Sequence, residues 1–423
     1  MKEDFLHYLW KFQKFSLVQL STIEGKPLHV VQVGTHNHDA GPDFLYAKIE
    51  IDGQLWAGHV ELHLKASDWY AHNHQHDFNY DNVVLHVVWE HDADVFRKDG
   101  STIETLELKG LVPKQLLDNY RSLNGEDKKF IACENDFGTV DGFVFQSWLW
   151  RLFVERLQKK NGVISEELER THNNWEAVLF AMLSKNFGLK LNGESFHSVA
   201  RSVDYSLIQK CIGNPLKLEA ILFGQAGLLE NEHTGNYFGL LKDNYHYAKN
   251  MSTISNQGVV LAKFFRLRPP NFPTLRLSQL AVLWASRPHL FSELMEAKTK
   301  EEIYPLFTVS ANEYWDNHYN FGIASSKRKK SITKGFMDLL IVNTVIPLKF
   351  AYAQQQGNDI IEELIDLALS LPAENNTLIA KFRDLRTMEA SAWHSQALLQ
   401  LKNEYCDKRR CLECEMGNFI LKR

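Results

Sequence analysis

The stretch "HDAGPDFLYAKIEIDGQLWAGHVELHLKASDW", residues 38–69, decides the fold that we expect for the first part of the chain. The segments "FLYAKIEI" and "LWAGHVELHL" read as strands and flank Asp52-Gly53, a dipeptide typical of a hairpin turn. Carboxylates and imidazoles crowd this hairpin, and such groups are costly to bury unless they are paired or bind a metal. They are therefore either exposed or part of a site.

The length of the hairpin loop determines which polar groups meet. A three-residue loop places Asp43 opposite His63, with Glu61 as a diagonal neighbour on the same face. A two-residue loop shifts the register by one residue and turns Asp43 to the other face. Glu61, His63 and Lys65 share a face with either loop, because side chains alternate along a strand.

The segments around the hairpin predict an α+β domain over residues 1–120. An amphipathic helix opens the chain at "EDFLHYLWKF", and a short β-branched strand follows at "LHVVQVGTH". After the hairpin, "NVVLHVVWE" is the near-continuous apolar run of a central strand, and "STIETLELKG" suggests one more strand. Beyond a polar connection at 111–140 the helical period dominates, so we expect residues 121–423 to form a large all-α domain.

Composition excludes several classes of protein. The chain has 423 residues and a formal charge of −5, so it is not a uniformly cationic nucleic-acid binder, although a local basic face is compatible with this charge. The most apolar run, "FMDLLIVNTVIPLKFAYA", contains Asp338, Pro347 and Lys349, which favours a buried helix over a membrane span. Five cysteines do not make a disulfide framework. We therefore expect a soluble cytoplasmic protein with no membrane partner.

The hairpin pattern is suited to a divalent cation. Two acidic oxygens and a main-chain carbonyl hold Mg²⁺ or Mn²⁺ while leaving positions for water. Such an ion activates a water and stabilises charge on a phosphoryl group. A basic residue beside the carboxylates can orient the water or neutralise the transition state.

Pro42-Asp43, followed after an 18-residue step by Glu61-Leu62-His63, resembles the PD-(D/E)XK nuclease superfamily. The order helix, three strands, helix, strand resembles its restriction-endonuclease-like fold, a mixed sheet with flanking helices. This resemblance implies that Asp43 and Glu61 bind metal and that the substrate is nucleic acid. His63 stands where the superfamily has lysine, a departure that bears on activity, and Lys65 is the candidate to take the role of that lysine.

A broader resemblance covers almost the whole chain. The segments "GPDFLYAKIEIDG", "NVVLHVVWE", "RLRPPNFPTLRLSQLA" and "YCDKRRCLEC" are similar to an uncharacterised bacterial family, domain of unknown function 2851. This resemblance implies no activity.

Histidines and cysteines suggest further metal sites. His72, His74 and His76 follow an H-x-H-x-H pattern suited to Zn²⁺, or form an exposed polar loop. Cys406, Cys411 and Cys414 are spaced C-x4-C-x2-C, which suits Zn²⁺ or an iron–sulfur cluster, or they are reduced and partly buried thiols. The tail supplies three ligands and a fourth must come from elsewhere. The candidates are Cys133, our first choice, Cys211 and His394.

Two basic segments are candidate phosphate contacts. "RLRPPNFPTLRL" carries Arg266, Arg268 and Arg276, and "SSKRKKSITK" carries Lys327 and Arg328. The alternatives are helix packing for the first segment and an ordinary solvated loop for the second. Three functions thus stay open. They are a metal-dependent nuclease, a non-catalytic binding or assembly protein that keeps the nuclease-like fold, and a zinc hydrolase that uses the histidine loop. An open cleft around His63 favours the first, and a closed core the second.

Overall fold

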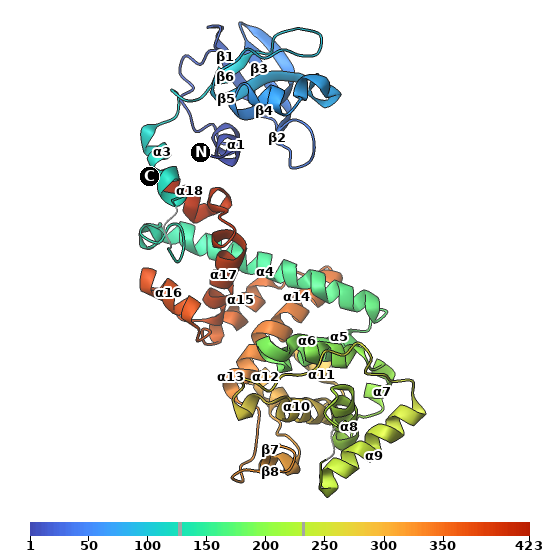
Figure 1. Ribbon diagram of the computed structural model, residues 1–423. Coiled ribbons are helices and arrows are strands. Elements are labelled where there is room, and N and C mark those ends of the chain that lie inside the picture. The colour runs from blue at the N-terminus through green and yellow to red at the C-terminus, as the bar shows by residue number, and fades with distance from the viewer. Residues whose placement is uncertain (126–128, 231–232) are drawn as a thin grey trace. The chain divides into compact units, whose positions relative to one another are not determined.

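The structure is a computed structural model that describes residues 1–125, 129–230 and 233–423 (Figure 1). It is α+β as predicted, with a mixed sheet near the N-terminus and many helices. The chain forms two compact units. The first comprises Met1–Trp148, Asp384–Thr387 and Leu401–Arg423, and the second Leu149–Arg383 and Met388–Gln400.

The unit boundaries place some helical segments with the sheet. Residues 121–148 and 401–423, which the sequence assigned to the helical domain, cluster with the N-terminal residues. Part of the predicted connection, residues 126–128, lies outside the described residues. The tail that carries three cysteines is therefore packed in the same unit as the polar hairpin.

The first unit is built on a six-stranded sheet in the order β1-β3-β4-β5-β6, with β2 paired to β3. Strands β1, β3 and β4 are antiparallel, whereas β5 and β6 run parallel to β4. The strands are β1 (Leu28–Gln32), β2 (Thr35–His36), β3 (Phe44–Ile51), β4 (Gln54–Lys65), β5 (Val83–Glu90) and β6 (Thr105–Glu107).

The β3–β4 hairpin turns through a two-residue loop. Asp52 and Gly53 both have positive φ (50° and 76°), as a type I′ turn requires. A bulge then changes the register along β3, and Tyr46 in it has φ 59°. Beyond the bulge Phe44 pairs with Val60. A two-residue loop alone would turn Asp43 to the opposite face of the sheet. The extra residue in the bulge turns it back, so that Asp43 lies on the face that carries Glu61 and His63.

Helix α1 (Glu3–Lys11) packs against β4 with its apolar side. Phe5, Leu6, Leu9 and Trp10 are fully buried, and each such side chain contributes about 2 kcal/mol of transfer free energy. A second apolar cluster surrounds β5. It comprises Ala66, Trp69, Tyr80, Val83, Val88, Val95 and Ile103.

Short helical elements complete the first unit. They are α2 (Asp68–Ala71), η1 (His74–His76), η2 (Phe78–Tyr80), α3 (Lys114–Leu123), η3 (Phe137–Thr139), the π-turn η7 (Leu401–Cys406), η8 (Cys411–Glu413) and α18 (Glu415–Leu421). The tail is tied to α3, because Asn119 Nδ2 donates to the carbonyl oxygen of Ile420 at 3.1 Å.

The second unit is helical, as predicted, and its described residues also include one short hairpin, β7 (His318–Asn320) and β8 (Ile323–Ala324). Its helices are α4 (Gly142–Arg170), which begins in the first unit, α5 (Trp175–Phe187), α6 (Leu189–Arg201), α7 (Tyr205–Gln209), α8 (Pro215–Gln225), α9 (Asn236–Met251), η4 (Pro269–Asn271), α10 (Pro273–Ser286), α11 (Leu290–Glu296), α12 (Lys300–Phe307), η5 (Glu313–Asp316), α13 (Lys334–Leu340), the π-turn η6 (Ile341–Val345), α14 (Ile346–Gln355), α15 (Ile361–Ser370), α16 (Thr377–Leu385) and α17 (Ala392–Gln400).

The most apolar run of the sequence forms one helix, Lys334–Gln355, made of α13, η6 and α14. By length and composition it is able to cross a membrane, but 78% of its most apolar window is buried inside the protein. Pro347 lies just after the π-turn, where a missing backbone N–H is tolerated. The segment has the burial of a core helix.

A buried carboxylate joins several helices of the second unit. Glu219 on α8 is fully buried and accepts hydrogen bonds from Trp315 Nε1 (2.7 Å), Tyr237 Oη (2.8 Å) and Ser278 Oγ (3.1 Å), and also from Asn312. Burial raises the pKa of Glu219 to about 6, although the four donors act to lower it. The bonds link α8 to α9, α10 and η5.

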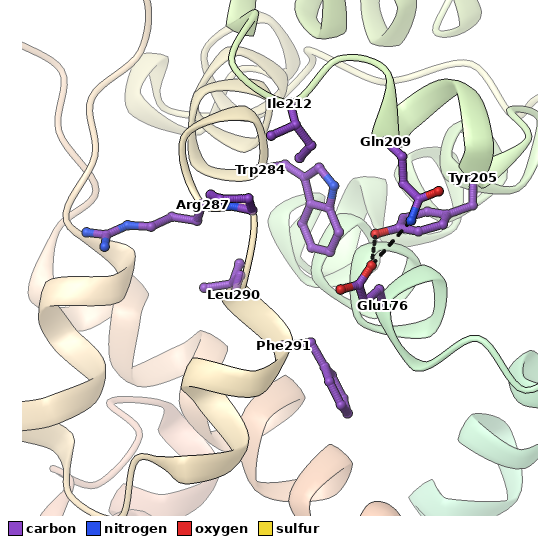
Figure 2. A pocket seen from close by; sticks show the side chains of 9 residues that line it. Glu176, Tyr205, Gln209, Ile212, Trp284, Arg287, Leu290 and Phe291 are labelled. Carbon is purple, nitrogen blue, oxygen red and sulfur yellow. Dashed lines mark hydrogen bonds between the residues drawn. The ribbon is translucent and has the colours of Figure 1, made fainter.

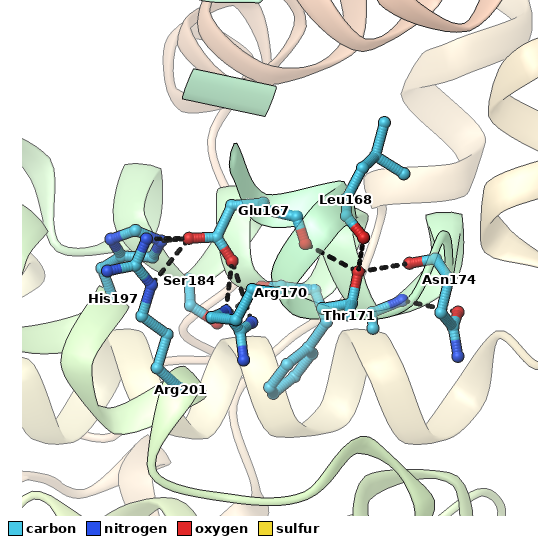
Figure 3. A network of polar contacts seen from close by, with 10 residues as sticks. Glu167, Leu168, Arg170, Thr171, Asn174, Ser184, His197 and Arg201 are labelled. Atoms are coloured by element: carbon cyan, nitrogen blue, oxygen red, sulfur yellow. Dashed lines mark hydrogen bonds and ion pairs between the residues drawn. The ribbon is translucent and has the colours of Figure 1, made fainter. Parts of the chain in front are cut away.

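A second buried carboxylate links α4 to α6 (Figure 3). Glu167 accepts from Arg170 Nε at 2.9 Å and Arg201 Nε at 2.6 Å, and His197 Nε2 lies 3.0 Å from Oε1. Burial alone would raise the pKa of this carboxyl, but the hydrogen bonds from His197, Arg201 and Arg170 outweigh it and lower the pKa to about 2.

This network predicts acid sensitivity of the second unit. Because the folded state lowers the pKa of Glu167 from its usual 4.5, the stabilisation is complete above pH 4.5 and is lost as the pH falls toward 2. We expect Glu167→Gln to cost about 2–3 kcal/mol at pH 7. Thermal melts of the two proteins from pH 7 to pH 2.5 should converge in acid. Glu166→Gln, the exposed neighbour, is the control and should melt like the wild type.

A close backbone approach fixes the start of the β4–β5 pairing. A Cβ on Gly58 would lie 2.5 Å from the carbonyl oxygen of Asn82 and 2.4 Å from Val84 Cγ1. We expect Gly58→Ala to destabilise the first unit by about 1–3 kcal/mol, measured by calorimetry. Gly110→Ala has open space around the new methyl group and should be neutral. Equal melting temperatures for the two variants would contradict the approach.

Candidate metal centre

Asp43 and Glu61 are joined by two hydrogen bonds across the open end of the hairpin. The backbone N–H of Asp43 donates to Glu61 Oε2 at 3.1 Å, and the N–H of Leu62 donates to Asp43 Oδ2 at 2.9 Å. Each carboxylate therefore accepts from the other strand's backbone. The bulge in β3 makes this possible, because it brings Asp43 level with Glu61 rather than with His63.

His63 lies on β4 on the same side as Glu61 and is only 1% exposed. Its Nε2 is 3.6 Å from Glu61 Oε1, and its Nδ1 is 2.8 Å from His86 Nε2 on β5. Donation from Nδ1 to His86 leaves the Nε2 lone pair of His63 on the side of Glu61. His86 is itself fully buried, and this hydrogen bond orients the ring of His63.

His72 and His74 reach the same place from the turn after β4. His72 follows α2, Asn73 has a left-handed conformation (φ 60°), and His74 begins η1. His63 Nε2 and His72 Nδ1 are 3.1 Å apart, and the ligand atoms of His63, His72 and His74 all lie within 4.8 Å of one another. His74 Nε2 is also 3.3 Å from Glu61 Oε1. We call these three residues the histidine trio.

The remaining residues predicted for this region lie elsewhere. His76 is exposed and outside the trio, because the segment forms a tight helical turn rather than a strand that would align all three imidazoles. Lys65 is exposed at the end of β4, and its charge acts on Asp92. Sequence alternation alone placed Lys65 on the face of Glu61, but the distance along the strand separates it from the trio.

Helix α1 contributes two further residues, His7 and Glu3, to this region. His7 Nε2 is 3.3 Å from Asp43 Oδ2. Burial lowers the pKa of His7, but the hydrogen bond and charge of Asp43 outweigh it and raise it. Glu3, one turn earlier, has a pKa raised by burial and by Asp43. The Glu3–His7 spacing of one helical turn was the signal available in the sequence.

The electrostatics of the cluster follow from burial. Glu61 is 5% exposed, and burial, followed by the charge of Asp43, raises its pKa to about 9. Burial also lowers the pKa of His63 to about 3 and lowers that of His74. Neutral imidazoles offer lone pairs, and a buried carboxyl of this kind is stabilised in its charged form by a nearby cation.

The donor set fits a divalent first-row metal ion. Carboxylate and imidazole are the ligands that Mn²⁺ and Zn²⁺ accept together. His74 Nε2 is buried, and Glu61 Oε1, itself a candidate ligand, lies 3.3 Å from it. His72 is exposed while His63 is buried, so the trio runs from the interior to the solvent. Glu61 and the trio would hold the ion, with Asp43 beside them.

The four cysteines predicted for the second site line one hollow in the first unit, and Cys133 is among them. Cys211 and His394, the other candidates for the fourth ligand, belong to the second unit. The other residues that line the hollow of the four cysteines are mostly apolar.

The basic residues differ in availability. Arg276 is 7% exposed, bonds Gln279 Oε1 at 2.9 Å and Asn271 Oδ1 at 2.6 Å, and lies over the ring of Phe336. Its guanidinium serves helix packing and is not presented to phosphates. The other four candidates are exposed in the second unit, namely Arg266, Arg268, Lys327 and Arg328.

The second unit also has a hollow of about 140 Å³ with an aromatic wall (Figure 2). Tyr205, Trp284 and Phe291 line it. Its carboxylate, Glu176, accepts from Tyr205 Oη at 3.1 Å and Gln209 Nε2 at 3.5 Å. Glu176 thus accepts hydrogen bonds from side chains of the protein itself. The hollow offers no group of metal ligands like the histidine trio among the residues that line it.

Comparison with known proteins gives a family but no activity. No curated protein and no solved structure matches the chain. A family model described as "Protein of unknown function (DUF2851)" matches residues 3–377, nearly the whole chain. The protein therefore belongs to the DUF2851 family.

Proposed function

We propose that the protein is a metal-dependent phosphodiesterase that acts on nucleic acid. The observation that carries this proposal is the convergence of Asp43, Glu61 and the histidine trio, with Glu61 Oε1 3.3 Å and 3.6 Å from two imidazole nitrogens. The order of helix and strands that presents them, with β5 parallel to β4, supports the resemblance to PD-(D/E)XK nucleases.

The residues take distinct roles in this proposal. Glu61 and the trio bind the cation, and Asp43 supplies a second carboxylate that is only partly exposed. The bound ion supplies an activated water and charge stabilisation on the phosphoryl group. His7 holds a proton beside Asp43, at a position suited to neutralise negative charge on the substrate. His86 keeps the ring of His63 in place.

The imidazoles refine the choice of metal. Mg²⁺ is bound through oxygen and keeps several waters, whereas Mn²⁺ and Zn²⁺ accept histidine. The trio therefore favours Mn²⁺ or Zn²⁺ over Mg²⁺ at this site. The nuclease hypothesis and the zinc-hydrolase hypothesis use the same cluster and differ only in the substrate.

Four exposed cations of the second unit are compatible with a nucleic-acid substrate. Arg266 and Arg268 lie in one exposed segment, and Lys327 and Arg328 lie in another. Exposed guanidinium and ammonium groups bind phosphates without reading sequence. These residues therefore support contact with the phosphate backbone of a nucleic acid, without preference for its base sequence.

One observation favours the second candidate, a non-catalytic binding protein. His63 and Glu61 are 1% and 5% exposed, which matches a closed core more closely than an open cleft. In that case the cluster would hold a structural ion, and the exposed cations would carry the function. Metal binding without hydrolysis is the result that separates this candidate from the first.

We expect purified protein with Mn²⁺ or Zn²⁺ to cleave a labelled DNA or RNA strand. Glu61→Gln should reduce the rate at least a hundredfold because it removes a charged ligand, and Asp43→Asn should do the same because it removes the second carboxylate beside the ion. The measurement is gel-resolved cleavage after treatment with chelator and re-addition of each metal. Asp39→Asn, an exposed residue in the preceding loop, is the control. Chelator-resistant cleavage, or full activity in Glu61→Gln, would contradict the proposal.

The trio also predicts which histidines bind the metal. Titration calorimetry with Zn²⁺ should show affinity lowered ten- to hundredfold in His74→Ala, because its buried Nε2 faces Glu61. His76→Ala should bind as the wild type does, because His76 lies outside the trio. Equal losses in both variants would favour an exposed, loosely organised histidine loop.

A further inference from the structure

Four cysteines that are far apart in sequence surround one small space in the first unit. Cys133 precedes η3, Cys406 ends η7, Cys411 begins η8 and Cys414 precedes α18. All four line one small hollow. Every pair of the four thiols is close enough for one to affect the ionisation of the other. Four thiolates around one space form a complete ligand set for a metal centre.

The backbone brings these cysteines together by local features of the tail. Cys406 and Cys411 are joined by a tight turn in which Arg409 has φ 54° and Arg410 N–H donates to the carbonyl oxygen of Tyr405 at 2.9 Å. The N–H of Cys414 donates to the carbonyl oxygen of Cys411 at 3.3 Å. The C-x4-C-x2-C spacing thus folds as a knuckle with its three cysteines turned to the hollow.

Gly417 permits the approach of this knuckle to α18. A Cβ at that position would lie 2.1 Å from the carbonyl oxygen of Cys411. The backbone N–H groups of Met416 and Gly417 also hydrogen-bond the side chain of Cys414. Such donors to sulfur are a recurrent feature around iron–sulfur clusters.

The spacing of the sulfurs distinguishes between metal groups. A single Zn²⁺ with Zn–S bonds of about 2.3 Å would draw its four sulfurs to within about 4 Å of one another. Over the residues that the structure describes, the ligand atoms that all lie within 4.8 Å are those of the histidine trio, and no three of these sulfurs meet that spacing. The cysteine ring is therefore wider than a zinc ion requires.

We propose that Cys133, Cys406, Cys411 and Cys414 bind a [4Fe–4S] cluster that fastens the C-terminal tail to the segment before η3. The cuboidal cluster holds its thiolates further apart than a single ion does, in agreement with the wider ring. Its hollow is otherwise lined by apolar side chains such as Leu123, Leu401 and Met416, which exclude water from the cluster.

The cluster would have a structural role that is separate from the proposed phosphodiesterase centre. It would link the tail to Cys133, and the residues of the second unit lie between these two segments in the sequence. Closing so long a loop lowers the conformational entropy of the unfolded chain. The tail also contacts α3 through Asn119 and Ile420, so the cluster would hold α18 in that position. Loss of the cluster should release residues 401–423 first.

The test is anaerobic purification of the full chain, followed by assay of iron, acid-labile sulfide and zinc. We expect about four iron and about four sulfide per chain, with visible absorption that bleaches on reduction. Cys133→Ser and Cys414→Ser should lose the iron, whereas Cys211→Ser, a buried thiol of the second unit, should keep it. One zinc per chain, or four freely titrating thiols and no metal, would overturn the cluster.

A second measurement covers variants that fail to fold. The wild-type chain is stripped of metal and then incubated anaerobically with ferrous iron and sulfide, and limited proteolysis follows each form. We expect the stripped form to be cut within residues 401–423 and the reconstituted form to be protected. Failure to take up iron, or identical cleavage of both forms, would contradict the proposal. These readouts do not depend on hydrolysis, so they stand apart from the test of the metal centre at Glu61.

Discussion

The first unit depends on one constraint, which is how to bury the carboxyl group of Glu61. Its Oε2 accepts from the backbone of Asp43, while its Oε1 faces His63 and His74. A buried carboxylate with few hydrogen-bond donors carries a large desolvation cost. Burial therefore raises the pKa of Glu61, together with the charge of Asp43, to about 9. A cation among these groups would offset that cost and also use the neutral imidazoles. Stability and the proposed chemistry therefore rest on the same atoms.

Three separate segments must be in place for that cluster to exist. The bulge in β3 sets the level of Asp43, β4 carries Glu61 and His63, and the left-handed Asn73 turns His74 back toward them. Each is a local backbone feature with its own conformational cost. Such conformations persist when the packing around them stabilises them. Here the buried side chains of α1 and the apolar cluster around β5 provide that packing.

The second unit solves the same problem differently. Glu167 and Glu219 are as fully buried as any carboxylate in the described chain, but each is surrounded by protein donors. Arginine and histidine neighbours lower the pKa of Glu167, whereas neutral donors leave the pKa of Glu219 raised. Glu167 and Glu219 therefore stabilise the packing of helices in the second unit. The contrast shows why Glu61, whose partners are mainly other potential metal ligands, is the carboxylate to associate with function.

The sequence by itself determined the α+β class, the hairpin and the helical period of the later residues, because these follow from side-chain alternation and turn chemistry over a few residues. It left two hairpin registers open, and the resemblance to nucleases singled out Asp43 and Glu61 as candidates. Tertiary structure decided which polar groups meet. The β3 bulge, the exclusion of His76 and Lys65, the arrival of His7 from α1 and the burial of Arg276 depend on contacts between segments and on strained backbone positions that no local pattern encodes. Cys133 was chosen as the partner of the tail cysteines because a fourth thiol was needed. Its position beside them depends on the fold of the whole first unit, because residues distant in sequence become neighbours only when the chain folds back on itself.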